Sequence, residues 1–334
     1  MAPLRAASEP LEPVVEGKGQ LWQPVFSGSN MSVYAIVVHG GAVTLKPEEL
    51  SQEEAGYQRI GLGDALHAGW SILNQGGTAL DAVEAAVRSL EDNPHFNAGR
   101  GSSLTLQGEA EMDAAIMDGS TLQAGAVSGV KYVRHPINLA RTVLERSPHV
   151  FLSGEGALEL ALEYGLPVAG PSYFETEKTR QQWLELAQQK VPALAGHDTV
   201  GAVALDQFGN LAVATSTGGI EGQRKGRVGD SPVLGGGTYA SNGACAVSCT
   251  GDGEVILRGA LAHEVYALVK YKGLPLAEAC QAAINLHDDQ LRGDKGIIAI
   301  DPQGLVAIEF NTNVMRRAYR VGEAEPVIAI YRDE

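Results

Sequence analysis

The 334-residue sequence predicts an α+β protein in which packed β-sheets are covered by helices. One observation is that strand-like segments occur in groups and helix-like segments occur in groups, whereas a doubly wound fold would alternate them strictly. The other is the composition, with 44% hydrophobic and 19% charged residues, which allows a large buried core. A chain of this length forms one large domain or two ordinary ones.

The N-terminal stretch carries no signal for ordered structure. Residues 1–31 are rich in Pro, Glu and Ser and lack the apolar segment of a secretory signal. We therefore expect a flexible extension, or a true start at Met31. The β-branched run at 33–38 then predicts a buried strand that ends in a tight turn at His39-Gly40-Gly41.

An amphipathic helix and a loop-rich stretch come next. Thr78 and Asp81 resemble a capping box, and the apolar residues of 80–90 recur at helical spacing. The stretch 93–108 contains Pro94 and three glycines, which predicts loops. Beyond it, the pattern predicts strands at 111–117 and 124–130 and helices at 138–145 and 154–164.

Residues 165–198 differ from their surroundings. They contain several Pro and Gly residues and one polar helical piece at 177–189, which predicts an exposed, poorly packed connector. The connector runs directly into a core strand at 199–205, an unusual junction that suggests a chain end at Thr199. Further strands are predicted at 211–215, 244–249, 297–300, 306–310 and 327–331, and helices at 255–270 and 276–286.

Charge and composition exclude several classes of partner. The formal net charge is −15, and no basic stripe is present that would bind the phosphates of a nucleic acid. No apolar stretch approaches the roughly 20 residues of a membrane-spanning helix. Only three cysteines are present, which is typical of a reducing compartment. We expect a cytoplasmic protein in which Cys245 and Cys249 are buried apolar residues.

The bond between Asp198 and Thr199 is the centre of the functional prediction. A threonine hydroxyl is a weak nucleophile unless a base takes its proton, and an α-amino group with a pKa near ~7.7–8 on the same residue is such a base. That arrangement requires Thr199 to begin a chain, so the precursor must cleave its own peptide bond. An ordinary threonine that opens a strand is the alternative, and for an isolated threonine it would be preferred.

Several longer motifs, in a fixed order, change that balance. The chain contains His39-Gly40-Gly41, the stretches 93–99 and 111–119, and Thr215-Ser216-Thr217-Gly218-Gly219. The segments 226–232 (Gly-Arg-Val-Gly-Asp-Ser-Pro) and 248–254 (Ser-Cys-Thr-Gly-Asp-Gly-Glu) follow. In these motifs the sequence resembles the isoaspartyl peptidase and plant-type L-asparaginase family of threonine-type N-terminal nucleophile hydrolases. That group also includes the glycosylasparaginases, and the resemblance runs from about residue 36 to near the C-terminus.

The resemblance implies a catalytic role for five matching residues. Thr199 would be the nucleophile, Thr217 would contact and tune it, and Asn97 would lie on a loop beside it. Thr250 and Gly251 would form the oxyanion hole, as a hydroxyl and a main-chain N–H. Taken alone, the residues around Thr250 would be interpreted as a simple turn.

On the substrate side, the resemblance implies a site for a small molecule or dipeptide with a free α-amino and a free α-carboxylate group. Arg227 would bind the carboxylate through its guanidinium fork, and Asp230 would bind the ammonium. Gly251 and Gly253 would let the substrate approach the backbone closely. The alternative for Arg227 and Asp230 is a surface ion pair worth ~0–1 kcal/mol. Glu109, Glu111 and Asp113 alternate as on a strand edge, and we assign them no role.

The resemblance also implies an architecture. The chain would form the four-layer αββα sandwich of N-terminal nucleophile hydrolases, with 32–334 as a single catalytic domain. Self-cleavage would divide it into 32–198 and 199–334, which would stay associated, and two such αβ units would form a homodimer, in total a heterotetramer. Catalysis would need no cofactor. A structural sodium ion would be bound by the main-chain carbonyls of Leu90, Glu91, Asn93, Phe96, Ala98 and Arg100.

The sequence departs from the family pattern at Asp198. Many members have glycine before the nucleophile, whereas His197-Asp198 is similar to the glycosylasparaginase motif. As a hypothesis, the Asp198 carboxylate accepts the threonine proton during self-cleavage. Three functions stay open. Hydrolysis of β-aspartyl peptides and L-asparagine, through a β-aspartyl ester on Thr199, is favoured over hydrolysis of glycosylasparagine, and both are favoured over a non-catalytic binding protein.

Overall fold

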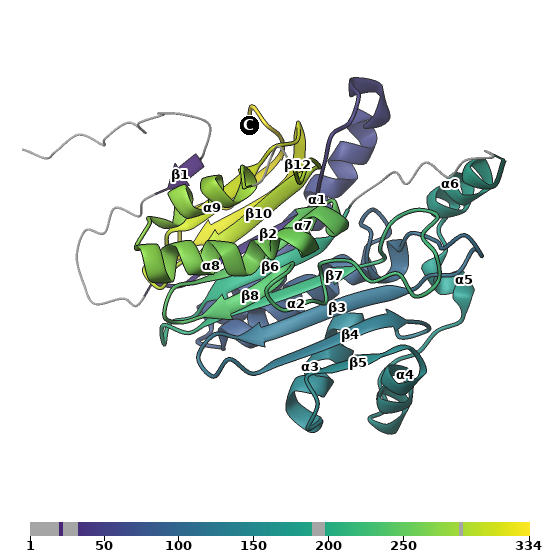
Figure 1. Ribbon diagram of the computed structural model, residues 1–334, viewed down its shortest axis with the longest axis horizontal. Coiled ribbons are helices and arrows are strands. Elements are labelled where there is room, and N and C mark those ends of the chain that lie inside the picture. Colours follow the sequence, from purple (N-terminus) through teal and green to yellow (C-terminus); the bar gives the residue numbers. More distant parts are fainter. Residues whose placement is uncertain (1–19, 23–32, 189–197, 287–289) are drawn as a thin grey trace, which may run out of the picture.

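The computed structural model describes residues 20–22, 33–188, 198–286 and 290–334 (Figure 1). Most of the predicted extension and the last part of the predicted connector, 189–197, lie outside these ranges. Within them, the chain forms two β-sheets with helices packed against them, which confirms the α+β class.

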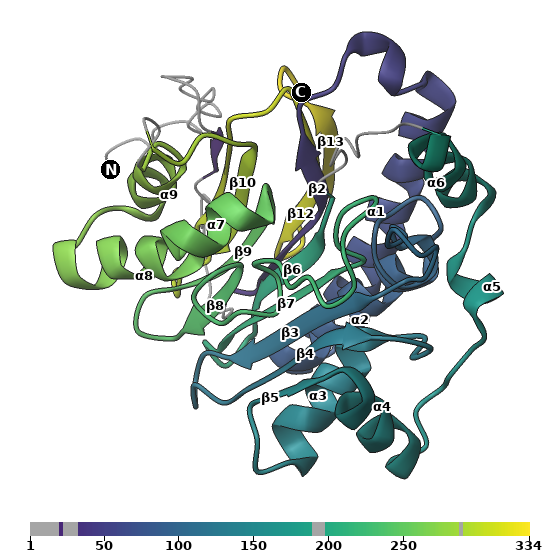
Figure 2. The same ribbon diagram turned by 45° about the vertical axis from the view of Figure 1, so that its right-hand side comes forward.

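The larger sheet has eight strands, and both predicted fragments contribute to it. In spatial order the strands are β13 (Val327–Tyr331), β12 (Val314–Val321), β2 (Ala35–Val43), β6 (Val200–Leu205), β7 (Leu211–Thr217), β3 (Met112–Asp118), β4 (Ala124–Val130) and β5 (Phe151–Ser153). β2, from the first fragment, pairs with β12 and β6 of the second, and β3 pairs with β7 (Figure 2). The two fragments are therefore interleaved in one hydrogen-bonded sheet.

The smaller sheet has five strands. Their order is β1 (Gln20–Trp22), β11 (Val306–Phe310), β10 (Lys295–Ile300), β9 (Cys245–Gly251) and β8 (Thr238–Ser241). β1 falls within the predicted flexible extension, so the structure differs from that prediction at three residues. They pair with β11, whose outer edge would otherwise present unpaired main-chain groups at this end.

Alternation along the strands builds the core in separate layers. Val37, Val203 and Val213 of the larger sheet point toward Ile298 and Ile308 of the smaller sheet and form the core between the sheets. Their neighbours, such as Ile36 and Ala202, face the opposite way and pack under helices. The outer face of the smaller sheet is covered in the same manner by α8 and α9.

The helices that cover the sheets include one that the sequence pattern did not predict. The helices are α1 (Gln52–Asn74), α2 (Ala79–Asp92), α3 (Pro136–Arg146), α4 (Gly154–Glu163), α5 (Pro171–Phe174), α6 (Glu177–Gln188), α7 (Gly253–Gly259), α8 (Leu261–Lys272) and α9 (Leu276–Ile284). The N-cap of α2 is Thr78, whose hydroxyl accepts from the Asp81 N–H as predicted. α1 was not predicted because its glycines weaken the helical pattern. Gly69 is needed there, since a Cβ would overlap Ile36 of β2.

Two local predictions are wrong. The strand at 33–38 does not end in a turn at His39-Gly40-Gly41 but continues to Val43. The glycines instead form a bulge opposite Arg316, where the β2 and β12 registers shift, and Gly41 has a positive φ of 110°. The helix predicted at 255–270 is divided into α7 and α8 at Ala260, whose φ of 47° is left-handed.

The described part of the predicted connector is exposed but not unstructured. α6 confirms the predicted polar helix, and only Thr179 of its residues is buried. Trp183 and Leu186 on its inner face lie against Gly108 and Gly222. This contact places α6 over the loops that lead to the candidate site.

Candidate active site

Thr199 lies at the start of β6, in the middle of the larger sheet. The side chain is 5% exposed. Its hydroxyl is 3.4 Å from Thr217 Oγ1, to which it donates, and 3.4 Å from Ser231 Oγ. Thr217 is brought there because β7 returns antiparallel beside β6, with Ser216 opposite Val200. The hairpin thus places the two predicted hydroxyls side by side.

The carbonyl that precedes Thr199 is held by two donors. Asn97 Nδ2 donates to the Asp198 carbonyl oxygen at 2.7 Å, and Thr217 Oγ1 donates to it at 3.3 Å. Asn97 is itself fixed, because Nδ2 also donates to the Gly219 carbonyl at 2.6 Å and Oδ1 accepts from the Ser103 N–H at 2.7 Å. Donors aimed at a carbonyl oxygen stabilise the negative charge that develops when a nucleophile attacks its carbon.

A small pocket brings most of the predicted residues together. Its walls include Thr199, Thr217, Arg227, Asp230, Gly251 and Gly253, with Asp198 and Ser231 beside them. The open volume is about 10 Å³, which is roughly the space of one water molecule. The pocket is therefore nearly filled.

Arg227 and Asp230 form the charged end of this pocket. Arg227 Nε and Nη2 donate to the two Glu254 carboxylate oxygens, both at 2.9 Å, and its guanidinium lies against Gly253. Asp230 is 3% exposed, and its Oδ2 has no hydrogen-bond partner among the described residues. Burial raises the pKa of the Asp230 carboxyl to about 7, and the Arg227 guanidinium opposes that shift. A ligand cation would remove the cost of ionising this carboxyl.

Thr250 does not line the pocket, although the adjacent Gly251 does. The Thr250 side chain is fully buried, and its hydroxyl accepts from the Ala42 N–H at 3.3 Å. Gly251 has a φ of 128°, and a Cβ there would overlap the Asp294 carbonyl, so the position requires glycine.

Two carboxylates without a predicted role fasten the loop that carries Arg227. Glu111 Oε2 accepts from the Gly226 N–H at 2.8 Å, on one side of Arg227. Asp113 Oδ1 accepts from the Gly129 N–H at 2.8 Å, and the Gly229 N–H on the other side of Arg227 also favours the ionised form of Asp113. Burial nevertheless raises the pKa of Asp113 to about 7. Asp113 lies on β3 and Glu111 immediately precedes that strand, so one short segment supports both ends of the loop.

The Asp198 side chain is bound away from the nucleophile. Its Oδ1 accepts from Arg316 Nη1 at 2.8 Å, and Arg316 is 4% exposed. The described hydrogen bonds of the Thr199 hydroxyl go to Thr217 and Ser231 and do not include this carboxylate. The geometry gives no support to the hypothesis that Asp198 accepts the threonine proton, because its carboxylate is turned toward Arg316.

The predicted sodium ligands lie in the last turn of α2 and in the loop that follows it. Gly99 and Gly101 let the chain close on itself, since a Cβ at either position would overlap the carbonyl of Glu91 or of Phe96. Main-chain carbonyls are suitable ligands for a hard cation. Four of these six, those of Leu90, Asn93, Phe96 and Ala98, accept main-chain hydrogen bonds within the loop, so the sodium site stays a prediction. Among the described residues there is no group of three or more His, Cys, Asp or Glu side chains that could hold a metal.

Comparison with known proteins identifies the family. Residues 32–330 match the model of the asparaginase family. The chain belongs to this family. It is 44% identical over 313 residues to an isoaspartyl peptidase of Salmonella typhimurium, covering 91% of this chain and 100% of that protein. A mouse isoaspartyl peptidase/L-asparaginase is 43% identical, with 86% and 87% covered, and a plant-type L-asparaginase of Pyrococcus abyssi is 44% identical, with 87% and 98% covered.

The structure adds residues to this asparaginase-family site that sequence reasoning did not assign. Ser231 lies in the segment 226–232, and its place directly after Asp230 is the signal that could have identified it. Glu254 was likewise quoted without a role. Arg316 gave no signal, because it lies on β12, a strand that the pattern did not predict.

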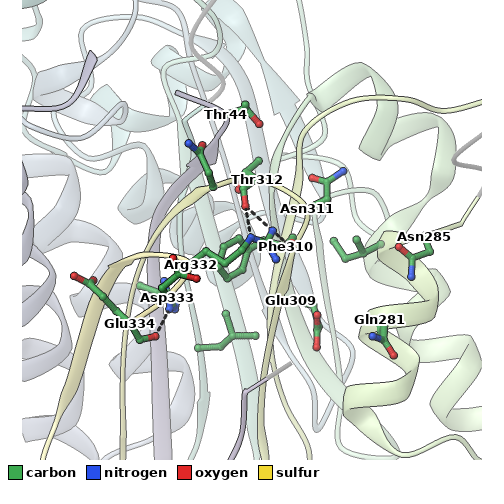
Figure 3. A pocket seen from close by; sticks show the side chains of 14 residues that line it. Thr44, Gln281, Asn285, Glu309, Phe310, Asn311, Thr312, Arg332, Asp333 and Glu334 are labelled. Atoms are coloured by element: carbon green, nitrogen blue, oxygen red, sulfur yellow. Dashed lines mark hydrogen bonds between the residues drawn. The ribbon is translucent and has the colours of Figure 1, made fainter. Parts of the chain in front are cut away.

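A larger pocket among the described residues lies elsewhere. It has a volume of about 1060 Å³ and contains none of the predicted catalytic or substrate-binding residues. Figure 3 shows it beside α9 and the C-terminal residues, with Glu309, Phe310 and Arg332 among its lining side chains. The pocket around Thr199 remains the better candidate, because it contains the predicted nucleophile and charged residues and the larger pocket does not.

None of the helices in the described ranges combines the length and apolarity that crossing a bilayer requires.

Proposed function

We propose that this protein is a self-cleaving amidohydrolase that acts on β-aspartyl peptides and L-asparagine, with Thr199 as its nucleophile. One observation carries the proposal: the Thr199 hydroxyl adjoins a carbonyl held by two donors, in the same pocket as Arg227 and Asp230. The names of the relatives, isoaspartyl peptidase and L-asparaginase, supply the substrate class. Both substrates present an α-carboxylate and an α-ammonium beside the amide to be cut.

The proposed self-cleavage is an acyl shift followed by hydrolysis. The Thr199 hydroxyl oxygen attacks the Asp198 carbonyl carbon, the hydroxyl proton passes to the Thr199 nitrogen, and the C–N bond breaks to leave an ester. Water then hydrolyses the ester, which produces the Asp198 α-carboxylate and a free Thr199 amino group. Asn97 and Thr217, at 2.7 and 3.3 Å from the carbonyl oxygen, would stabilise the charge that develops there.

Substrate hydrolysis would follow the same order of steps. The free α-amino group takes the Thr199 hydroxyl proton while the oxygen attacks the β-carbonyl carbon of the substrate. By the resemblance, the Gly251 N–H and the Thr250 hydroxyl would stabilise the oxyanion. This role requires the Thr250 hydroxyl, which does not line the pocket, to turn toward it. The leaving amine or ammonia departs with the proton. Water hydrolyses the β-aspartyl ester to release L-aspartate. Arg227 would hold the α-carboxylate throughout and Asp230 the α-ammonium.

The remaining family expectations belong to the same proposal. The two packed sheets with helices outside them support a four-layer αββα sandwich built by 32–198 and 199–334 as one domain. A dimer of cleaved units, a sodium ion on the carbonyls after α2, and a cytoplasmic location stay predictions. No cofactor takes part in any of the steps above.

Two alternatives are less favoured. The His197-Asp198 dipeptide suggests hydrolysis of glycosylasparagine, but the relatives named above are isoaspartyl peptidases and asparaginases. A non-catalytic binding protein would not need Asn97 and Thr217 to converge on the carbonyl before Thr199.

The test combines the mass of the purified chain with its substrate preference. We expect two fragments that meet between Asp198 and Thr199, and a single uncut chain for Thr199→Ala. Turnover is then compared for a β-aspartyl dipeptide, L-asparagine and glycosylasparagine. A wild-type chain that stays intact and inactive would refute the proposal, and preferred turnover of glycosylasparagine would select the alternative.

A further inference from the structure

Asp198 is fastened to a buried arginine at the edge of the pocket. Arg316 Nη1 donates to Asp198 Oδ1 at 2.8 Å, while Arg316 Nε donates to Gln58 Oε1 at 2.8 Å. Arg316 and Gln58 are 4% and 1% exposed. Gly41, in the bulge of β2, leaves room for the carboxylate, because a Cβ there would overlap it. The fold therefore contains a fitted place for one aspartyl side chain immediately before the nucleophile.

The same polar network also holds the helix at the other end of the connector. Gln58 Nε2 donates to Glu54 Oε1 at 3.3 Å. That carboxylate pairs with Lys178 of α6 at 2.9 Å and with His95 at 2.9 Å. Lys178 is half exposed, so its pair with Glu54 is weak. In the pair at Arg316, the arginine side chain is 5% exposed and the carboxylate is 27% exposed. Asp198, at the end of the connector, is thus held more firmly than α6.

We propose that Arg316 is a positioning residue for self-cleavage and that, after cleavage, it retains the freed Asp198 chain end in the pocket, where it competes with substrate. The inference rests on the proposed self-cleavage and concerns the step that follows it. Before cleavage, the ion pair fixes Asp198 with its carbonyl oxygen facing Asn97 and Thr217. After cleavage, the contacts of Asp198 persist.

Three physical reasons favour retention of the end. Cleavage converts the carbonyl oxygen into part of a carboxylate, which Asn97 and Thr217 bind more strongly than a neutral carbonyl. Departure of Asp198 would leave the buried Arg316 guanidinium without its carboxylate, and breaking such a pair is costly. The new Thr199 ammonium would also lie beside the new carboxylate, and this attraction keeps the amine protonated when it must act as a base.

Retention matters because the end occupies the space that substrate needs. With Asp198 in place, the pocket has about 10 Å³ of open volume, far less than an aspartyl group requires. Substrate can enter only when the chain end leaves. A glycine at this position has no side chain for Arg316 to bind, so its end would leave readily.

The experiment compares activity per cleaved molecule. Wild type, Asp198→Gly and Asp198→Asn are purified, the cleaved fraction is measured by intact mass, and initial turnover of a β-aspartyl dipeptide is divided by it. Glu163→Gln is the matched control, because it removes one carboxylate from an exposed residue of α4. We expect both Asp198 variants to exceed wild type and the control by about tenfold or more per cleaved chain. Equal values in all four proteins would overturn the proposal.

Inhibition by a peptide tests retention independently of the rate at which the variants cleave themselves. The peptide acetyl-Gly-His-Asp, which copies the chain end, should inhibit cleaved Asp198→Gly competitively, whereas acetyl-Gly-His-Gly should not. If neither Asp198 variant cleaves, a protease site is inserted after Lys190 in the wild-type chain and the short end is removed by dialysis. The rate should then rise, and an unchanged rate would overturn retention. Failure of self-cleavage itself is distinguishable, because it leaves the wild-type chain in one piece.

Discussion

Replacing Asn97 by alanine removes the side-chain amide that donates to the carbonyl of the bond proposed to be cleaved. In the wild-type chain, that amide donates to the Asp198 and Gly219 carbonyls at 2.7 and 2.6 Å and accepts from the Ser103 N–H at 2.7 Å. The Thr217 hydroxyl would remain as a donor to the Asp198 carbonyl, at the longer distance of 3.3 Å. The substitution therefore removes the better placed of the two donors.

The magnitudes follow from those contacts. Loss of one donor to a developing oxyanion slows a reaction by about 10²–10³-fold, and we expect the half-time of self-cleavage to lengthen by that factor. The Gly219 carbonyl and the Ser103 N–H would be left without these partners, at about 1–3 kcal/mol each. The resulting loss of about 2–6 kcal/mol is smaller than the upper range of domain stability, about 15 kcal/mol, so the variant should still fold.

The assay separates the two effects. The uncleaved fraction is followed by intact mass after rapid purification, and the free energy of unfolding is measured in urea with Thr199→Ala in both chains. Asn138→Ala is the control, because it removes an amide of α3 that contacts Glu84. A folded Asn97→Ala chain that cleaves as fast as wild type would refute the role assigned to this side chain.

Three further predictions concern the substrate loop, the charged end of the pocket and the bulge. Glu111→Ala should raise KM about tenfold with little change in kcat, because one hydrogen bond to a charged group, worth about 1.5–3 kcal/mol, no longer holds the Arg227 loop. Glu111→Gln keeps an acceptor and should have a smaller effect. Steady-state kinetics would contradict this if kcat fell and KM did not change. Because burial raises the pKa of Asp230 to about 7, this carboxyl is neutral below that pH, and KM should fall as the pH rises through about 7. A KM that is independent of pH would count against Asp230 as the ammonium ligand. Gly41→Ala should slow self-cleavage at least tenfold, because the Gly41 φ is 110° and the added Cβ overlaps the Asp198 side chain. A second substitution, Asp198→Gly, should restore part of the rate in the mass assay.

Local patterns were enough to predict much of the fold. Thr78 and the helical spacing after it predicted α2, and apolar runs predicted β4, β11 and β13 with their observed bounds. Failures occurred where tertiary packing overrides local preference. The glycines of α1 look like helix breakers until the close approach of Gly69 to β2 is seen. The bulge at Gly41 depends on Arg316, a residue far away in the sequence.

The candidate site was predictable in proportion to how local its motifs are. Thr199, Thr217, Arg227 and Asp230 belong to motifs that were quoted from the sequence, and the structure brings them to one pocket. The sequence assigns Glu111 no role, because alternation on a strand edge explains a carboxylate equally well without function. Only the three-dimensional arrangement reveals that its carboxylate meets the Gly226 N–H, 115 residues further along the chain.

The burial of Thr199 also determines that folding must come before the proposed self-cleavage. Chain ends usually lie at the surface, but the amino end proposed here would lie in the middle of an eight-stranded sheet, on a residue 5% exposed. An aminopeptidase or acetyltransferase acting on the folded protein could neither create this end nor modify it. An extended nascent chain does not bring Asn97 to the Asp198 carbonyl, so the proposed self-cleavage would have to wait for folding. Self-cleavage would then report that the fold has formed.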